Sequence, residues 1–158
     1  MANTQSMCTS FMGELLTATH NFGTAPTRGT STADTFKAAL YLTTATVNAS
    51  TTAYSSTNEV SGTGYTAGGV TVTNATAPTA TNSSATAGVA YWTPSASITY
   101  TTVTLTTAFD CVLIYNSSQS NKAVSVHTFG SQTVTAGTFT LTMPANTTST
   151  ALLRLATT

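Results

Sequence analysis

Charged side chains are scarce in this sequence of 158 residues: four are basic and four are acidic, so 5% of the chain is charged and the formal net charge is zero. In an ordinary globular domain about a quarter of the residues are charged. Four cations spread along the chain cannot form a basic patch, which argues against binding nucleic acid through its phosphates. Because 41% of the residues are apolar, the chain also lacks the composition of a highly charged disordered protein.

Long hydrophobic runs are absent as well. No stretch approaches the roughly 18 apolar residues that a membrane-spanning helix needs, so we expect no membrane partner. The first residues show neither the basic nor the apolar part of a secretory signal, and the two cysteines, Cys8 and Cys111, match no metal-binding or redox spacing. We therefore expect two free thiols in a protein that is made and kept in a reducing cytoplasm.

Hydroxyl residues are what the sequence has in excess: 41 Thr and 17 Ser make up 58 of the 158 residues. They have to provide the surface hydration that charged groups supply in other proteins. An uncharged surface causes little repulsion between copies, and a polar, Thr-rich β surface is well suited to lie against another protein. This composition favours a component of an assembly, and a homo-oligomer.

Residues 9–23 have helical periodicity, with Phe11, Leu15 and Phe22 on one face and Gly23 as a suitable stop. A helix of about 14 residues is not stable alone in water. Its apolar stripe must therefore pack against another surface. This makes Phe11, Leu15 and Phe22 candidate interface residues.

From Asp34 onward the hydrophobic period changes to two, which predicts β-strands. Cys111–Tyr115 is the most continuously apolar run, so we expect it in the centre of a sheet with both faces buried. Ala136 and Gly137 predict a hairpin turn, and Arg154 marks the last strand as an edge. The predicted strands cover residues 35–42, 69–73, 90–92, 97–105, 109–115, 123–129, 132–134, 137–143 and 151–155.

About eight short strands with one short N-terminal helix predict a mainly β protein, an antiparallel β-sandwich or jelly roll. We expect residues 1–23 to form an N-terminal arm and helix, and residues 24–158 to form a single β-sandwich domain. Two low-complexity segments, 43–56 and 74–88, consist almost wholly of Thr, Ala, Ser and Asn. They are compatible with loops or with exposed polar strands.

Residues able to do chemistry are few and scattered. His20 and His127 are the only histidines, and each has a structural explanation, in the last turn of the predicted helix and on a predicted strand. The four acidic residues do not cluster, so neither a carboxylate pair for glycoside hydrolysis nor a calcium site is indicated. We expect no catalytic residue, no metal and no cofactor, and therefore no enzyme.

The glycine-rich segment 58–70 surrounds Tyr65 with four glycines and leads into a strand. A phosphate-binding loop would need a Lys and a following helix, and neither is there. The segment predicts a tightly turned loop anchored by Tyr65, with Glu59 as its one fixed charge. The alternative is that Glu59 and Tyr65 contact another subunit, which makes both of them candidate interface residues.

Several stretches spread over nearly the whole chain form a recognisable set: Met7–Phe11, Glu14–Leu16, Asp34–Tyr41, Thr51–Tyr54, Glu59–Gly69, Phe109–Tyr115 and Asn121–Ala123. Together they resemble a family of small virion structural proteins of tailed bacteriophages. These are scaffold motifs, and they contain no catalytic residue. The resemblance implies a virion component, assembled in the host cytoplasm, whose partners are the major capsid protein or other virion proteins.

We therefore expect a non-enzymatic structural protein of a phage particle, in the first place a capsid cement or decoration protein. It would bind the shell in many copies and stabilise it, because many modest contacts add up. The alternative among structural proteins is a subunit associated with the neck, tail or fibres. An alternative of another class is a carbohydrate-binding β-sandwich on the virion surface, with Trp92, Tyr91 or Tyr100 as its stacking platform.

Overall fold

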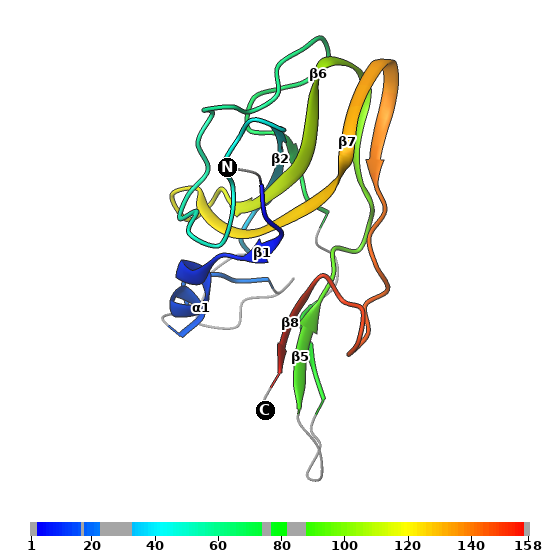
Figure 1. Cartoon of the computed structure of the whole chain (residues 1–158). Helices are drawn as coiled ribbons and strands as arrows, with labels where there is room; N and C mark the ends of the chain where they lie inside the picture. Colours follow the sequence, from blue (N-terminus) through cyan, green and yellow to red (C-terminus); the bar gives the residue numbers. More distant parts are fainter. Residues whose placement is uncertain (1–2, 17, 23–32, 74–76, 82–87, 157–158) are drawn as a thin grey trace.

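The computed structural model describes residues 3–16, 18–22, 33–73, 77–81 and 88–156. Over these residues the protein is mainly β, with two antiparallel sheets and one short helix, which confirms the predicted fold class and agrees with a β-sandwich. Figure 1 shows the larger sheet above and the smaller sheet below it, beside the helix. The elements are β1 (Ser6–Met7), α1 (Thr9–Leu16), β2 (Phe36–Leu42), β3 (Val70–Thr71), β4 (Thr79–Ala80), β5 (Val89–Trp92), β6 (Ile98–Asn116), β7 (Lys122–Leu141) and β8 (Leu153–Ala156).

The larger sheet has the strand order β1-β7-β6-β2-β3, and the smaller sheet has the order β4-β5-β8. All neighbouring strands in both sheets are antiparallel. β6 lies between β7 and β2, and its residues Cys111–Asn116 are buried. This confirms the central position predicted for Cys111–Tyr115. β8, which contains Arg154, is an edge strand, as predicted.

β6 and β7 form one long hairpin where the sequence predicts five shorter strands. β6 has 19 residues and β7 has 20. The pairing between them shifts register several times, including between Tyr100 and Val103 and between Leu105 and Phe109. Bulges bend a strand and increase its twist. The hairpin therefore arches over at the top of the molecule instead of continuing straight (Figure 1).

The hairpin turn predicted at Ala136 and Gly137 is wrong. Both residues lie inside β7, where Gly137 pairs with Val103 of β6. Ala136 has a φ of 45°, and its N–H donates to Oγ1 of Thr104 at 3.0 Å. Small residues suit a bulge as well as a turn. The local composition that predicts a turn thus marks an irregularity within a continuous strand.

The helix is shorter than predicted. α1 ends at Leu16, whereas the predicted stop at Gly23 lies outside the described residues. Ala18 has a φ of 54°, and its N–H donates to the carbonyl oxygen of Leu15 at 3.1 Å. A residue in this left-handed conformation cannot continue a helix. Phe22 consequently lies in the chain that follows α1 and not on its face.

β2 is buried more completely than its alternation predicts. Phe36, Ala38 and Leu40 are buried as expected, and Ala39 and Tyr41 are buried as well. The strand lies between β6 and β3, and residues of the irregular chain between β2 and β3 belong to the same core. The first low-complexity segment, 43–56, is such a loop, and two of its residues belong to the core.

Gly69 occupies a position where the backbone admits no side chain. Its φ is 71°, and a Cβ atom placed there would lie 1.6 Å from the carbonyl oxygen of Ala38. We expect Gly69→Ala to lower the free energy of unfolding by at least about 3 kcal/mol, as measured by urea denaturation. The control is Gly130→Ala, since a Cβ there meets nothing within 4 Å; its effect should stay below about 0.5 kcal/mol. Equal effects of the two substitutions would contradict this explanation.

Candidate functional site

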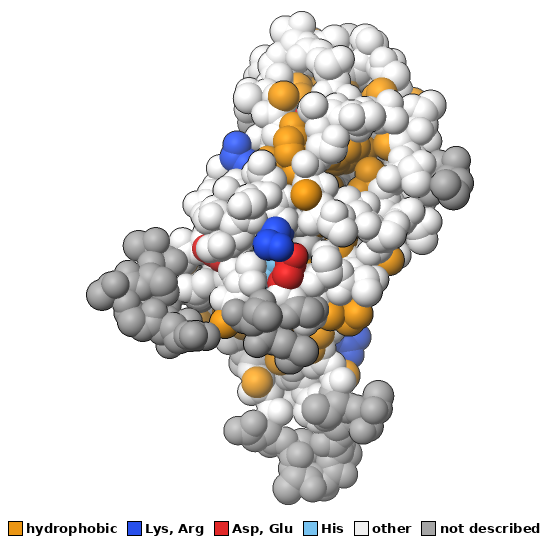
Figure 2. All heavy atoms as spheres, turned by 90° about the vertical axis from the view of Figure 1, so that its left-hand side faces the viewer, with side chains coloured by type: hydrophobic (Ala, Val, Ile, Leu, Met, Phe, Trp, Pro, Cys, Tyr) orange, Lys and Arg blue, Asp and Glu red, His pale blue; other side chains and the backbone are white. Residues whose placement is uncertain are grey.

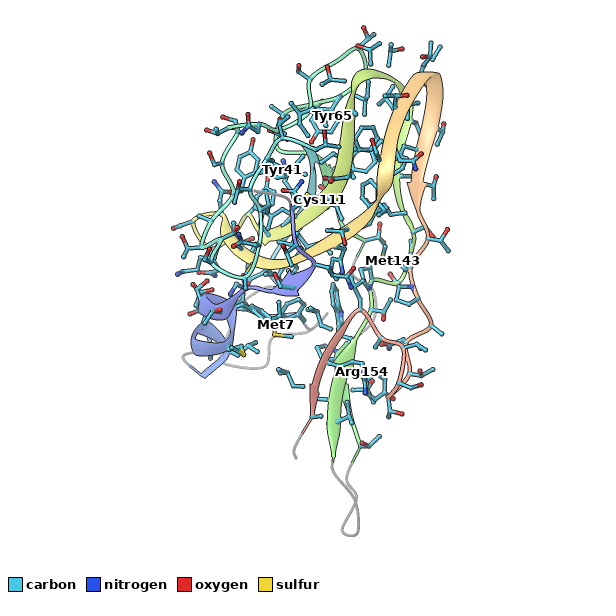
Figure 3. All side chains as sticks on the ribbon, viewed as in Figure 1. Met7, Tyr41, Tyr65, Cys111, Met143 and Arg154 are labelled. Atoms are coloured by element: carbon cyan, nitrogen blue, oxygen red, sulfur yellow. The ribbon has the colours of Figure 1, made fainter. Side chains whose placement is uncertain are left out.

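The five residues expected at an interface separate into two groups. Phe11, Leu15 and Phe22 lie together beside α1, where they line one cavity. Glu59 and Tyr65 belong to a hydrogen-bonded cluster in the larger sheet. Figure 3 shows the separation: Tyr65 lies near the upper end of the molecule, and Met7, which borders the cavity, lies next to α1.

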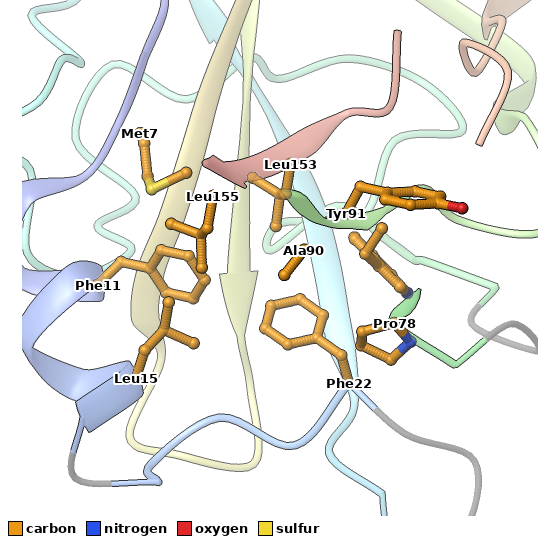
Figure 4. Close-up of a pocket in the computed structure, with 10 residues that line it drawn as sticks. Met7, Phe11, Leu15, Phe22, Pro78, Ala90, Tyr91, Leu153 and Leu155 are labelled. Atoms are coloured by element: carbon orange, nitrogen blue, oxygen red, sulfur yellow. The ribbon is translucent and has the colours of Figure 1, made fainter. Parts of the chain in front are cut away.

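The cavity lies between α1 and the smaller sheet and has a volume of about 110 Å³. Phe11 and Leu15 of α1 approach it from one side, and Leu153 and Leu155 of β8 from the other (Figure 4). Phe22 closes part of its wall. Because the side chains around it are apolar, the cavity offers no group that could orient a polar ligand.

Aromatic packing accounts for two of the candidates in this group. The ring of Phe22 stacks on Phe36 with 4.3 Å between centroids and lies 4.7 Å from Trp92. Phe11 meets Phe22 edge to face at 5.8 Å. The apolar stripe of α1 is therefore packed against the protein's own strands. Leu155 lines the cavity and is also 42% exposed to solvent, so the apolar surface of the cavity continues onto the outside of the protein.

The residues expected to form a carbohydrate platform are mostly inside the protein. Trp92 and Tyr100 are each 2% exposed. The hydroxyl group of Tyr100 donates to the carbonyl oxygen of Ala38 at 2.8 Å, which fixes the ring within the core. Neither ring can stack on a sugar. Only Tyr91 retains partial exposure among the three.

Glu59 is buried, and its carboxylate accepts three hydrogen bonds, each 2.7 Å long. Tyr54 donates to one carboxylate oxygen, and Tyr65 and the N–H of Gly68 donate to the other. The hydroxyl oxygen of Tyr65 also accepts a hydrogen bond from the N–H of Leu40 at 3.1 Å. Glu59 thereby ties the glycine-rich loop to β2.

The tyrosines around Glu59 are fixed as hydrogen-bond donors. Burial, followed by the hydrogen bond to Glu59, raises the pKa of both Tyr54 and Tyr65 above the ordinary value. Both hydroxyl groups therefore keep their protons at neutral pH. The ring of Tyr65 also stacks on Tyr100, with 5.9 Å between centroids. These contacts explain Glu59 and Tyr65 within a single chain, as the loop anchor that the glycine-rich segment predicts.

A second polar network joins the region of α1 to the turn between β6 and β7. Glu14 accepts a hydrogen bond from Lys122 at 2.7 Å and lies 2.7 Å from Nε2 of His20. Asn116 contacts Nδ1 of His20 at 3.1 Å and donates to Asp34 at 2.7 Å. Both ring nitrogens of His20 therefore have a polar partner within the chain. The prediction that His20 lies in the last helical turn is wrong, since α1 ends before it.

The carboxylate of Glu14 stays charged in this network. Partial burial acts to raise the pKa of Glu14, but the hydrogen bonds from Lys122 and His20 outweigh burial and hold the pKa below its ordinary value. The side chain of His20 is completely buried. The network therefore holds the chain after α1 against β6, and it presents no base to solvent.

The other sites of possible chemistry are also internal. Cys8 and Cys111 are free, as predicted, and both are also buried. Burial raises the pKa of Cys8 to about 11 and the pKa of Cys111 to about 12, so neither thiol is a nucleophile at neutral pH. Within the described ranges, three or more His, Cys, Asp or Glu side chains nowhere gather as a metal site would require. The helix that the structure describes is too short to cross a membrane.

The outer edge of β7 is a feature that the sequence analysis missed. β1 pairs with Ser125 and Val126, and residues 127–141 have β6 as their one neighbouring strand in the described part of the chain. The predicted turn at Ala136 concealed this edge, because it divided β7 into shorter pieces. A signal was present in the sequence: Thr recurs at every second position on both sides of that residue.

No protein-family model, no curated protein and no solved structure matches the chain. Its function has to be inferred from its own residues and their arrangement.

We expect Glu59→Gln to lower the free energy of unfolding by about 2–3 kcal/mol in urea denaturation. The NH₂ group of Gln replaces one acceptor oxygen, so at least one of the three buried donors loses its acceptor. The matched control is Asp110→Asn. Asp110 is partly exposed and accepts a hydrogen bond from Asn3 at 2.6 Å. Asp110→Asn should therefore lower the free energy of unfolding by less than about 1 kcal/mol. If Glu59→Gln lowers the free energy of unfolding no more than Asp110→Asn does, Glu59 is not the residue that holds the glycine-rich loop in place.

His127 should make stability depend on pH. Burial lowers the pKa of His127 from 6.5 to about 4. Between these values the unfolded chain binds a proton that the folded chain does not, so the free energy of unfolding should fall as pH is lowered through this window. Glu14, with its lowered pKa, contributes only below about 4.5, its ordinary value. His127→Gln should therefore flatten the pH dependence between pH 6.5 and 4.5; an unchanged slope would contradict the prediction.

Proposed function

We propose that this protein is a non-enzymatic structural subunit of a tailed-phage virion, a capsid cement or decoration protein that binds the shell in many copies. The observation that supports the proposal is that all four acidic side chains are engaged in hydrogen bonds within the chain. Each of the four carboxylates, Glu14, Asp34, Glu59 and Asp110, accepts a hydrogen bond from a donor within the chain. Groups that could act on a ligand hold the fold together instead.

The surface that remains is suited to broad contact with protein. Thr99, Thr101, Thr138 and Thr140 on β6 and β7 are exposed hydroxyl residues. A hydroxyl group can donate and accept, so it can adapt to many partners. Figure 2 shows one face of the molecule, where charged side chains occupy only a few small areas. Such a surface can be covered without removing many charges from water, which would cost several kcal/mol for each charge.

The stretches that resemble the virion protein family coincide with the frame of the fold. Asp34–Tyr41 contains most of β2, and Phe109–Tyr115 contains the buried centre of β6. Glu59–Gly69 is the loop held by the carboxylate of Glu59. The resemblance therefore supports a shared architecture. Membership of the virion is proposed on this basis, together with the uncharged surface.

Counting the protein in purified particles tests the proposal. We expect quantitative mass spectrometry, with the major capsid protein as internal reference, to find on the order of hundreds of copies per particle. About a dozen copies would instead support the alternative of a neck, tail or fibre-associated subunit, whose symmetry limits the copy number. Absence of the protein from purified particles would overturn both.

A further inference from the structure

The last part of β7 is a regular strand with a free edge. Leu141, Thr140 and Phe139 pair in sequence with Ile98, Thr99 and Tyr100 of β6. Where the register then shifts, the extra residue belongs to β6, so β7 itself continues without a bulge back to Gly137. On the other side of this segment the described residues place no strand. Alternate backbone N–H and C=O groups of the segment are therefore open to pairing by an extended chain.

This edge lacks the features that usually prevent such pairing. Natural edge strands are protected by Lys, Pro, inward-pointing charges or a covering element. Residues 128–143 include no charged residue and no proline. Thr138 and Thr140 are exposed, while Phe139 and Leu141 are half-buried beneath them. The segment from Gly137 to Leu141 thus presents a clean edge of about five residues, an ordinary strand length.

We infer that this segment of β7, Gly137–Leu141, pairs antiparallel with the same segment of a second copy of the chain. The order Thr138, Phe139, Thr140 reads the same in both directions. Pairing centred on Phe139 places Thr138 of each copy opposite Thr140 of the other, and Phe139 opposite its own counterpart. Thr–Thr and aromatic cross-strand pairs are favourable, and no like charges meet.

The symmetry of this contact agrees with the fold. A twofold axis perpendicular to the sheet keeps the buried face of both copies on the same side, so Phe139 remains packed against Tyr100 and Phe109. The two larger sheets then continue into one another. A twofold contact of this kind is closed, and it makes a dimer without starting a filament.

The contact is small, so it should be weak in free solution. Stable dimers bury far more surface than one pair of five-residue strands provides. We expect dissociation constants between about 1 μM and 1 mM. Copies gathered on one surface would pair at much lower bulk concentration, because attachment raises their effective concentration. The inference goes beyond the proposed function and does not depend on it.

Variants that introduce charges into this segment test the pairing by sedimentation velocity over a range of concentrations. The wild type should dimerise as concentration rises, whereas T138K/T140K and T138E/T140E should each dimerise at least about tenfold more weakly, because like charges then face each other. An equimolar mixture of the two variants should restore the dimer. The control T106K/T107K adds the same charge to exposed residues of β6 and should dimerise like the wild type.

Cysteine cross-linking tests the register. Thr138→Cys mixed with Thr140→Cys should form a disulfide-linked dimer on oxidation, and either variant alone should form much less. Cys8 and Cys111 are buried and should not compete.

The inference is overturned by a wild type that stays monomeric up to about 1 mM, by a dimer that persists in both charged variants, or by equal cross-linking of one variant alone. A monomer that needs Thr138 and Thr140 to attach to particles would indicate a strand from another protein instead. The copy number of the wild-type protein on particles is measured separately, so the proposed function can fail or stand whatever the result for the dimer.

Discussion

The buried carboxylate of Glu59 is the interaction on which the upper part of the fold depends. A charge at this depth costs several kcal/mol unless donors surround it. Tyr54, Tyr65 and Gly68 supply those donors, and all three lie in the irregular chain between β2 and β3. The loop can therefore close in one arrangement only. A segment without regular secondary structure becomes a rigid part of the protein, held to Leu40 of β2.

The sequence predicted those strands whose burial produces a simple hydrophobic pattern along the chain. Phe36–Leu42 and Cys111–Tyr115 were found from alternation and from continuous apolar character, because each reflects the burial of a single strand. The long hairpin could not be found in this way. Ala136 and Gly137 have the composition of a turn, and only their pairing with β6, centred on Val103, keeps them inside a strand.

The candidate site divides in the same manner. The sequence predicted that the apolar stripe with Phe11 and Phe22 must be covered, and the two rings do pack together, although Phe22 lies beyond the end of α1. The surface that covers them belongs to both sheets, because Phe22 packs on Phe36 of β2 and on Trp92 of β5, and no local pattern indicates this arrangement. Likewise the charge of Glu59 was evident, but its tyrosine partner Tyr54 is brought to it by the path of the loop. The free edge of β7 is a property of the complete sheet.

The topology also imposes an order on folding. β5 and β8 pair at Trp92 and Leu153, and the whole β6–β7 hairpin lies between them in the chain. Closing the smaller sheet first would mean closing a loop of about 60 unfolded residues, an entropic cost that grows with loop length. The hairpin joins neighbouring strands through a short turn and can form early, on a timescale of about 1–10 μs. It then delivers the ends of β5 and β8 to each other. On the ribosome the sequence of events is the same, because β8 follows the hairpin in the chain, and the cavity between α1 and the smaller sheet closes only after β8 has emerged.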